Sequence, residues 1–272
     1  MNKVQLADRV LDGINRRQSK VVLRRRTAHE AEIHQLRHER AETEQRLLDK
    51  RFFAAKSFLK GQGIEIGALH RPLVTPPDVT VRYVDRYGVD DLRAHYPELA
   101  ELPLVPVDIV DDGETLSTIK RASQNFVIAN HFLEHCQDPI RTLENMINSL
   151  RPDGIIYMAI PDKRFTFDEK RPVTPFEHLL RDYEEGPEWS KQQHFEEWVE
   201  LVKGVRGKAE AAKRTQELID EDYSIHFHVW TQLDLLDFFS RLQRELNFAI
   251  NFELIAQNNE EVIVILRHSK AS

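Results

Sequence analysis

The sequence predicts an α/β fold built on a doubly wound, mostly parallel sheet of seven strands. Five short apolar runs alternate with polar or helical stretches between residues 63 and 160. Continuous apolar runs of this length are typical of strands buried on both faces. Two further runs, residues 248–255 and 261–266, are joined by a polar Gln-Asn-Asn stretch and predict a terminal antiparallel hairpin. Strands that alternate with helices and then end in a hairpin give a parallel sheet with one reversed strand.

The predicted parallel strands are Gly63–Ile66, Val81–Val84, Leu104–Val110, Phe126–Ala129 and Ile155–Ile160. Two helices around them are marked by their first residues. Asp138 can cap a helix whose first turn begins with Pro139. Thr231 and Asp234 have the spacing of a capping box, which predicts a second helix from residue 231.

The first sixty residues differ in charge from the rest of the chain. Residues 1–60 carry 15 basic and 8 acidic side chains, whereas residues 61–272 carry 23 and 37. We therefore expect a charged helical extension over residues 1–60 and one globular domain over residues 61–272. The apolar seam of the extension is interrupted by Arg40 and Thr43. This favours a solvated or docked helix over a strong coiled coil, and leaves a homodimer or a partner contact open.

The composition excludes several classes of protein. Hydrophobic residues make up 41% of the chain, which is enough for a buried core, yet no apolar run reaches the length of a membrane span. Cys136 is the only cysteine, and residues 1–10 lack the apolar core of a signal peptide. These features predict a cytoplasmic protein without disulfides. The acidic balance of residues 61–272 argues against nucleic acid as a substrate.

Polar residues and glycines gather where the predicted strands end. Ligands of doubly wound folds bind at the carboxyl ends of the strands, so these residues predict a ligand site. A glycine there lets the backbone approach the ligand, and a carboxylate can accept hydrogen bonds from ribose hydroxyls. The candidate cofactor-binding residues are Glu65, Gly67, Asp85, Arg86, Asp112, Gly113 and Asn130.

The ordered runs EIG, YVDR, DDGETL, ANHFLEHCQDP and LRPDGIIYMAIPD resemble the motif series of class I S-adenosylmethionine-dependent methyltransferases. The resemblance spans residues 61–162 and implies a Rossmann-like fold with S-adenosyl-L-methionine as cofactor. It implies contacts to the methionine part at Glu65 and Gly67, to the ribose at Asp85, and to the adenine at Asp112 and Gly113. Within that class, IPDKRFTFD, TPFEHLLRDY and HFHVWT are similar to methyltransferases of glycan and polysaccharide biosynthesis.

The chain departs from this family in two places. Its first loop reads EIGALH and lacks the second glycine of the usual D/E-x-G-x-G pattern. The usual helix after the first strand is also hard to find, because residues 70–80 contain three prolines. We therefore expect the first loop to hold the methionine part in a different way.

The segment His131-Phe-Leu-Glu134-His135 carries the candidate catalytic chemistry. In a helical turn His131, Glu134 and His135 share one face, which would suit Mg²⁺ or another divalent metal. The same spacing occurs in a zinc protease motif, which the strand before it disfavours. Two other interpretations stay open: a metal-free catalytic histidine, or a segment that only shapes the cofactor loop. The candidates for proton transfer are His135, His131 and Asp162.

Residues 163–230 interrupt the alternation of strands and helices and predict a lid on the acceptor side. The segment is rich in aromatic, charged and histidine side chains, a combination that suits a sugar. Its candidate acceptor-binding residues are His178, Arg181, Tyr183, His194, His226 and His228. The leading hypothesis is O-methylation of a sugar hydroxyl in a glycan or glycolipid precursor. The alternatives are methylation of a small phenol or carboxylate, and a cofactor-binding scaffold without turnover.

Overall fold

The computed structural model describes residues 33, 37, 45 and 50–269, apart from the side chain of Glu98. The chain divides into two compact units, residues 1–49 and 50–272. The helical extension predicted for residues 1–60 therefore lies mostly outside the described residues. Residues 50–58 are helical and belong to the second unit, which begins earlier than the change in charge suggests.

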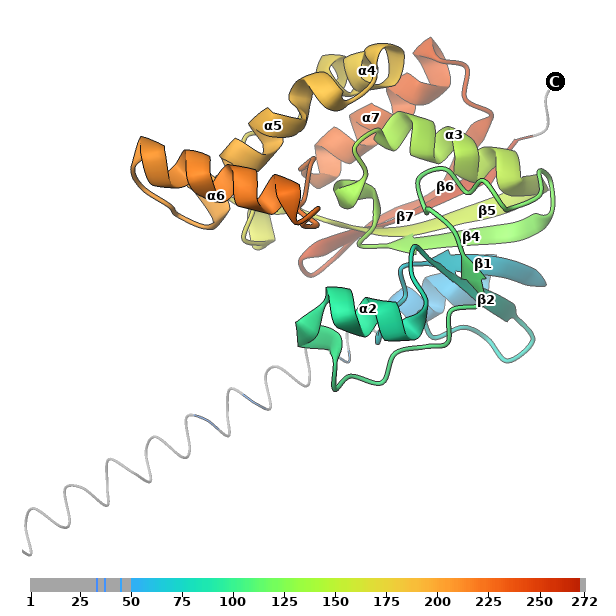
Figure 1. Cartoon of the computed structure of the whole chain (residues 1–272). Helices are drawn as coiled ribbons and strands as arrows, with labels where there is room; N and C mark the ends of the chain where they lie inside the picture. Colours follow the sequence, from blue (N-terminus) through green and yellow to red (C-terminus); the bar gives the residue numbers. More distant parts are fainter. Residues whose placement is uncertain (1–32, 34–36, 38–44, 46–49, 270–272) are drawn as a thin grey trace, which may run out of the picture. The chain divides into compact units, whose positions relative to one another are not determined.

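The second unit contains the predicted seven-stranded sheet, in the order β3-β2-β1-β4-β5-β7-β6 (Figure 1). All neighbouring strands are parallel except that β7 runs antiparallel to both β5 and β6. The doubly wound sheet with a terminal hairpin is thus confirmed. The strands are β1 Gln62–Ile66, β2 Thr80–Asp85, β3 Ile109–Val110, β4 Gln124–Asn130, β5 Leu150–Pro161, β6 Ile250–Asn258 and β7 Glu261–His268.

The third strand is shorter than predicted, because only Ile109 and Val110 pair with β2. Pro106 lies in the segment that was expected to pair and Pro103 directly before it, and proline has no N–H for a sheet ladder. The amide of Val105 instead donates to the carbonyl of Leu69, 2.8 Å away. The predicted strand from residue 104 is therefore wrong over most of its length.

Helices cover both faces of the sheet. On one face α3 (Pro139–Ser149), α4 (Phe176–Glu185) and α7 (Gln232–Glu245) pack over alternate residues of β4, β5 and β7. On the other face Ala54, Ala55 and Leu59 pack on Phe126 and Tyr157. The expected capping residues act as predicted: Asp138 accepts from the amide of Arg141, and Thr231 with Asp234 forms a capping box.

No helix forms in residues 67–79, between β1 and β2. The three prolines predicted this absence. The buried carboxylate of Glu65 accepts hydrogen bonds from the amide of Leu73 at 2.9 and 3.2 Å, and so fixes this loop against β1. Residues 50–58 provide helical cover on that face of the sheet.

The insertion after β5 is helical and has its own small core. It contains η3 (Lys163–Phe165), α4, α5 (Glu188–Glu197), the π-helical η4 (Trp198–Val202) and α6 (Lys208–Asp220). Phe195, Val199, Leu218 and Phe227 are buried together in this core. The insertion lies beyond the end of the sheet where β5 finishes (Figure 1), which is the side where the sequence places a lid.

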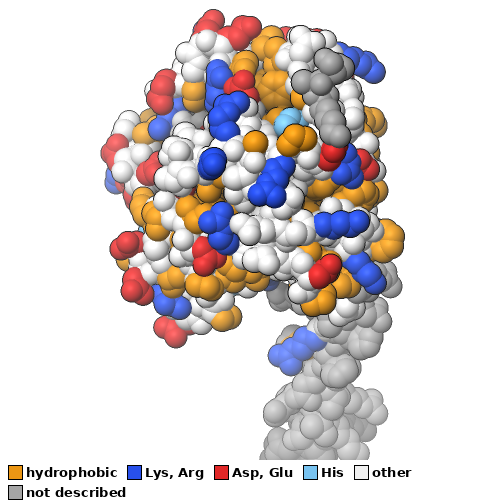
Figure 2. All heavy atoms as spheres, turned by 90° about the vertical axis from the view of Figure 1, so that its right-hand side faces the viewer, with side chains coloured by type: hydrophobic (Ala, Val, Ile, Leu, Met, Phe, Trp, Pro, Cys, Tyr) orange, Lys and Arg blue, Asp and Glu red, His pale blue; other side chains and the backbone are white. Residues whose placement is uncertain are grey.

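The shorter elements are α2 (Val89–His95), η1 (Pro97–Leu99) and η2 (Leu133–His135). Within the described part of the chain, every helix is too short or too polar to cross a bilayer. On the face seen in Figure 2, basic side chains gather near the middle and acidic ones lie mainly toward the margin. The acidic balance of the domain is therefore unevenly distributed over that face.

Candidate active site

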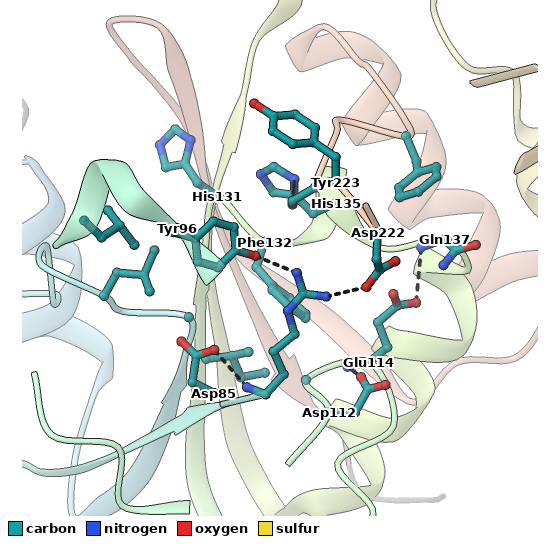
Figure 3. A pocket seen from close by; sticks show the side chains of 18 residues that line it. Asp85, Tyr96, Asp112, Glu114, His131, Phe132, His135, Gln137, Asp222 and Tyr223 are labelled. Atoms are coloured by element: carbon teal, nitrogen blue, oxygen red, sulfur yellow. Dashed lines mark hydrogen bonds and ion pairs between the residues drawn. The ribbon is translucent and has the colours of Figure 1, made fainter. Parts of the chain in front are cut away.

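A pocket of about 500 Å³ lies where the first parallel strands end. This volume is typical of sites for small molecules and cofactors. Its wall joins residues that follow β1, β2, β3 and β4 to the last residues of the insertion (Figure 3). The pocket is lined by Ile66, Gly67, Leu69, Asp85, Arg86, Tyr96, Leu99, Asp112, Gly113, Glu114, His131, Phe132, His135, Gln137, Asp222, Tyr223, Ser224 and Phe227.

Two glycines of the pocket are required for different reasons. Gly67 has a φ of +63°, a conformation that side chains with a Cβ rarely adopt, and open space lies where its Cβ would be. Gly113 is enclosed: a Cβ there would lie 2.6 Å from both Ile66 Cγ2 and Phe132 Cζ. Gly67 thus leaves the first loop open to a ligand, and Gly113 lets the loop after β3 pack tightly.

Asp85 and Arg86 form the polar part of the pocket next to β2. Oδ1 of Asp85 accepts from the amide of Arg86 at 2.8 Å, and burial raises the pKa of the Asp85 carboxyl. The guanidinium of Arg86 donates to the Tyr96 hydroxyl at 2.6 Å and to Oδ2 of Asp222 at 3.1 Å. Arg86 therefore connects the end of β2 to Asp222 in the last part of the insertion. Its two partners, Tyr96 and Asp222, are labelled in Figure 3.

The loop after β3 is tied to the start of α3 by Glu114. One carboxylate oxygen of Glu114 accepts from the amides of Gln137 and Asp138 at 3.1 and 3.4 Å. Burial raises the pKa of Glu114 to about 7, although these two amides act in the opposite direction. Asp112 remains exposed, and its Oδ1 accepts from the amide of Glu114 at 2.7 Å.

His131 follows β4 with a φ of +49° and stands between two carboxylates. Its Nε2 lies 2.9 Å from Glu261, and its Nδ1 lies 3.5 Å from Glu134. Burial opposes the charged imidazolium, but the two carboxylates outweigh burial and raise the pKa of His131 to about 9. His131 is therefore a cation and a hydrogen-bond donor at neutral pH, not a base.

His135 has the opposite character, although it is only four residues away. Its Nδ1 donates to the carbonyl of Ile225 at 2.9 Å, and Oγ of Ser224 lies 3.0 Å from the same nitrogen. Burial lowers the pKa of His135 to about 4, despite the nearby carboxylate of Glu134. With the proton on Nδ1, Nε2 carries a lone pair at neutral pH, which a general base requires.

Three predicted residues of the cofactor and catalytic sets do not line the pocket. Glu65 turns inward to the amide of Leu73. Asn130 ends β4, and its buried amide atoms have no hydrogen-bond partner among the described residues. Asp162 is fully buried and accepts from Arg164 at 2.6 and 2.9 Å. These bonds give Asp162 a structural role at the end of β5.

The six residues predicted to bind the acceptor lie behind the pocket wall rather than in it. His178, Arg181 and Tyr183 are on α4 and His194 is on α5. Arg181 pairs with Glu185, and Tyr183 lies under the guanidinium of Arg141. His226 pairs with Asp168 at 2.7 Å. The segment before Trp230, which carries His226 and His228, forms no strand.

The insertion instead contributes residues that the sequence did not single out. They are Asp222, Tyr223, Ser224 and Phe227, and Tyr96 and Phe132 join them from elsewhere in the chain. Of these residues, only Phe132 could have been predicted to line the pocket, because it follows His131 at the end of a predicted strand. The others are brought to the pocket by the fold of the insertion and of the loop after α2.

The predicted metal residues are not brought together as one group. Glu134 and His135 share a cluster with His226, in which one possible ligand atom of each lies within 4.8 Å of the others. His131 is not part of that cluster, because it faces Glu261 as well as Glu134. Among the described residues a second group, His178, Asp182, His194 and His228, meets the same distance criterion.

A family model described as a methyltransferase domain matches residues 33–241 of the chain. The search of curated protein sequences found no match to the chain.

Among solved structures, the CurJ carbon methyltransferase is similar at 13% identity and a TM-score of 0.40, over 78% of this chain and 49% of its own. A SAM-dependent methyltransferase from Thermotoga maritima is similar at 12% identity and a TM-score of 0.42, over 86% of this chain and 97% of its own. A SAM-dependent methyltransferase from Aquifex aeolicus is similar at 10% identity and a TM-score of 0.36, over 77% of this chain and 83% of its own. The chain thus spans about half the length of the first of these structures.

Proposed function

Because the chain belongs to the methyltransferase-domain family and is a SAM-dependent methyltransferase, we propose that it transfers the methyl group to a hydroxyl of its acceptor. The observation that carries this proposal is His135, a neutral imidazole in the pocket wall. A hydroxyl is a poor nucleophile until its proton is removed, whereas a neutral amine already carries the lone pair that attacks the methyl group. A base that stays neutral throughout the physiological range of pH fits a hydroxyl acceptor.

The strand-end residues fit S-adenosylmethionine. The open first loop at Gly67 leaves room for the methionine part, and the carboxylate of Asp85 can accept hydrogen bonds from the ribose hydroxyls. The exposed carboxylate of Asp112 can accept from the adenine amino group. We therefore place the cofactor along the ends of β1, β2, β3 and β4.

The bound cofactor supplies an electrophilic methyl group on a positively charged sulfur. The remaining work belongs to the chain. Nε2 of His135 accepts the hydroxyl proton, and the carbonyl of Ile225 holds the proton on Nδ1 so that this tautomer persists. The charged His131 donates a hydrogen bond and remains protonated at neutral pH. Positioning of the acceptor oxygen by the pocket wall contributes the rest of the rate.

We further propose that the acceptor is a sugar hydroxyl in a glycan or glycolipid precursor. The insertion places Tyr223 and Phe227 in the pocket wall beside His135 and Ser224. Aromatic rings can cover the C–H face of a sugar, while the serine and histidine bond its hydroxyls. The acceptor contacts then come from residues 222–227 more than from the residues on α4 and α5.

The proposal is tested in two stages. Calorimetric titration with S-adenosylhomocysteine measures the cofactor site, and methyl transfer from labelled cofactor to sugar, phenol and carboxylate acceptors measures the substrate class. We expect sugars to be methylated and the turnover of His135→Gln to fall by roughly two orders of magnitude, with S-adenosylhomocysteine affinity nearly unchanged. Methylation of only phenols or carboxylates would contradict the sugar assignment. Unchanged turnover in His135→Gln would contradict the assignment of the base.

A further inference from the structure

Four side chains of the insertion, three buried and one half-buried, converge away from the cofactor pocket: the half-buried His178 and Asp182 on α4, His194 on α5, and His228 just before α7. We call them the insertion histidine cluster. One ligand atom from each lies within 4.8 Å of the others. None of the four lines the cofactor pocket. Three imidazoles and one carboxylate are a donor set that zinc favours in proteins.

The distances within the cluster match a tetrahedral ion. Nε2 of His178 lies 3.0 Å from Nε2 of His194 and 3.3 Å from Oδ2 of Asp182. Nε2 of His228 lies 3.8 Å from the same carboxylate oxygen. Zinc bonds of about 2.0–2.1 Å at tetrahedral angles place neighbouring ligand atoms about 3.3 Å apart. The two separations measured from Nε2 of His178 lie near that value, and the His228 ring approaches the same carboxylate oxygen.

The hydrogen bonding of the cluster is incomplete without a further partner. Oδ2 of Asp182 and Nδ1 of His228 are buried and accept no hydrogen bond from any described residue. Buried polar atoms are nearly always paired, so two such atoms in one cluster indicate a ligand.

Supporting contacts already hold the four residues in place. Oγ of Ser190 donates to Oδ1 of Asp182 at 2.9 Å, which orients the other carboxylate oxygen toward the histidines. Nε2 of His228 lies 3.2 Å from the carbonyl of Gln137 and donates to it, which leaves Nδ1 as the nitrogen that can bind the ion. Carbonyl and hydroxyl partners of this kind typically fix the orientation of metal ligands.

We propose that the insertion histidine cluster binds one zinc ion in a closed structural site. Such an ion would join α4, α5 and the segment before α7. That segment is the one whose amide at Phe227 donates to the carbonyl of Glu134, at 2.7 Å, beside the pocket. The site thus stabilises the wall that carries the acceptor-side residues without taking part in methyl transfer. The proposal is independent of the acceptor assigned above.

The other group of possible ligands, Glu134, His135 and His226, is less complete. It offers three donors rather than four. His226 is already held by Asp168 at 2.7 Å, and Nδ1 of His135 is held by the carbonyl of Ile225. Substitutions in the two groups therefore distinguish the two sites: zinc bound in the insertion is lost when the insertion histidine cluster is altered, and zinc near the pocket is not.

The test measures zinc in the full chain, produced in zinc-supplemented medium and purified without chelator. Elemental analysis should find one zinc per chain, and the Co²⁺-substituted protein should show the intense visible bands of a four-coordinate site. X-ray absorption on the unaltered protein should show only nitrogen and oxygen ligands. Asp182→Asn and His194→Gln should each lower the affinity for zinc by more than about tenfold.

His268→Gln is the matched control, because His268 lies on β7, outside both groups of possible ligands. It should bind zinc like the unaltered chain. The proposal is overturned if the unaltered chain binds no zinc even after dialysis against the metal, or if sulfur ligation is seen. It is also overturned if folded Asp182→Asn and His194→Gln retain full zinc, since the ion would then sit elsewhere. If these variants do not fold, the number of imidazole ligands in the absorption spectrum of the unaltered chain decides: three support the insertion histidine cluster, and two place the ion in the other group and overturn the proposal.

Discussion

Replacement of Gly113 by alanine tests the packing of the cofactor pocket most directly. The added Cβ would lie 2.6 Å from Ile66 Cγ2 and from Phe132 Cζ. Carbon atoms pack at about 3.5–4.0 Å, so each neighbour would have to retreat by about 1 Å. Both side chains line the pocket, but Ile66 is buried within β1, whereas Phe132 is only half-buried and lies in the loop after β4. We therefore expect the ring of Phe132 to move into the space that the cofactor needs.

Overpacking of this kind costs about 1–3 kcal/mol. For a domain of this size that corresponds to a fall in Tm of roughly 2–12 °C. Thermal unfolding measures the stability, and titration with S-adenosylhomocysteine measures the binding, which should weaken at least tenfold because Phe132 is displaced. Gly88→Ala is the control, since nothing lies within 4 Å of its Cβ and its φ is −66°. If Gly113→Ala melts and binds like Gly88→Ala, the described packing around the pocket is incorrect.

Four further changes test other parts of the structure. Asp85→Ala should weaken S-adenosylhomocysteine binding about ten- to a hundredfold by calorimetry, because a hydrogen-bonded carboxylate typically contributes about 1.5–3 kcal/mol; unchanged affinity would place the ribose elsewhere. The pKa of His131 is raised to about 9, so protonated His131 should stabilise the folded chain fully below about pH 6.5. This stabilisation should be lost as the pH rises through 9, and in His131→Gln that decline in thermal stability should disappear. Arg171→Met removes a buried guanidinium that bonds Asp168 at 2.9 Å and should cost about 3–5 kcal/mol in urea unfolding; a cost below 1 kcal/mol would contradict a buried ion pair. Thr231→Ala removes the capping box of α7 and should cost about 1 kcal/mol, whereas Thr231→Ser should not.

Much of the fold could be predicted because local signals and tertiary packing agree. The fully buried parts of β4 and β5, Phe126–Ala129 and Ile155–Ile160, are continuous apolar runs. The capping residues Asp138 and Thr231 bond to backbone amides only three residues later, so the local sequence is enough to predict them. β3 was overestimated because apolar residues predict burial, but hydrogen bonding of the ladder depends on donors that proline lacks.

The pocket was only partly predictable, for a similar reason. Gly67, Asp85 and Gly113 follow strands whose order the topology fixes, so their meeting could be inferred from the sequence. Asp222 and Tyr223 reach the same pocket from a position more than a hundred residues later in the chain. Their place depends on how α4, α5 and α6 pack, and no local pattern carries that information.

His131 and His135 illustrate the limit most clearly, since the sequence presents them as equivalent. A spacing of four residues suggested one face and one shared role, yet their pKa values are raised to about 9 and lowered to about 4. Burial lowers both pKa values, but only His131 also faces Glu261, a residue 130 positions away in the sequence. The carboxylate of Glu261 is itself held by Arg51, and this pair keeps the pKa of Glu261 at about 2 although burial acts against it. The proton on His131 therefore depends on contacts between both ends of the domain, and these contacts leave His135 as the only one of the two that can act as a base at neutral pH.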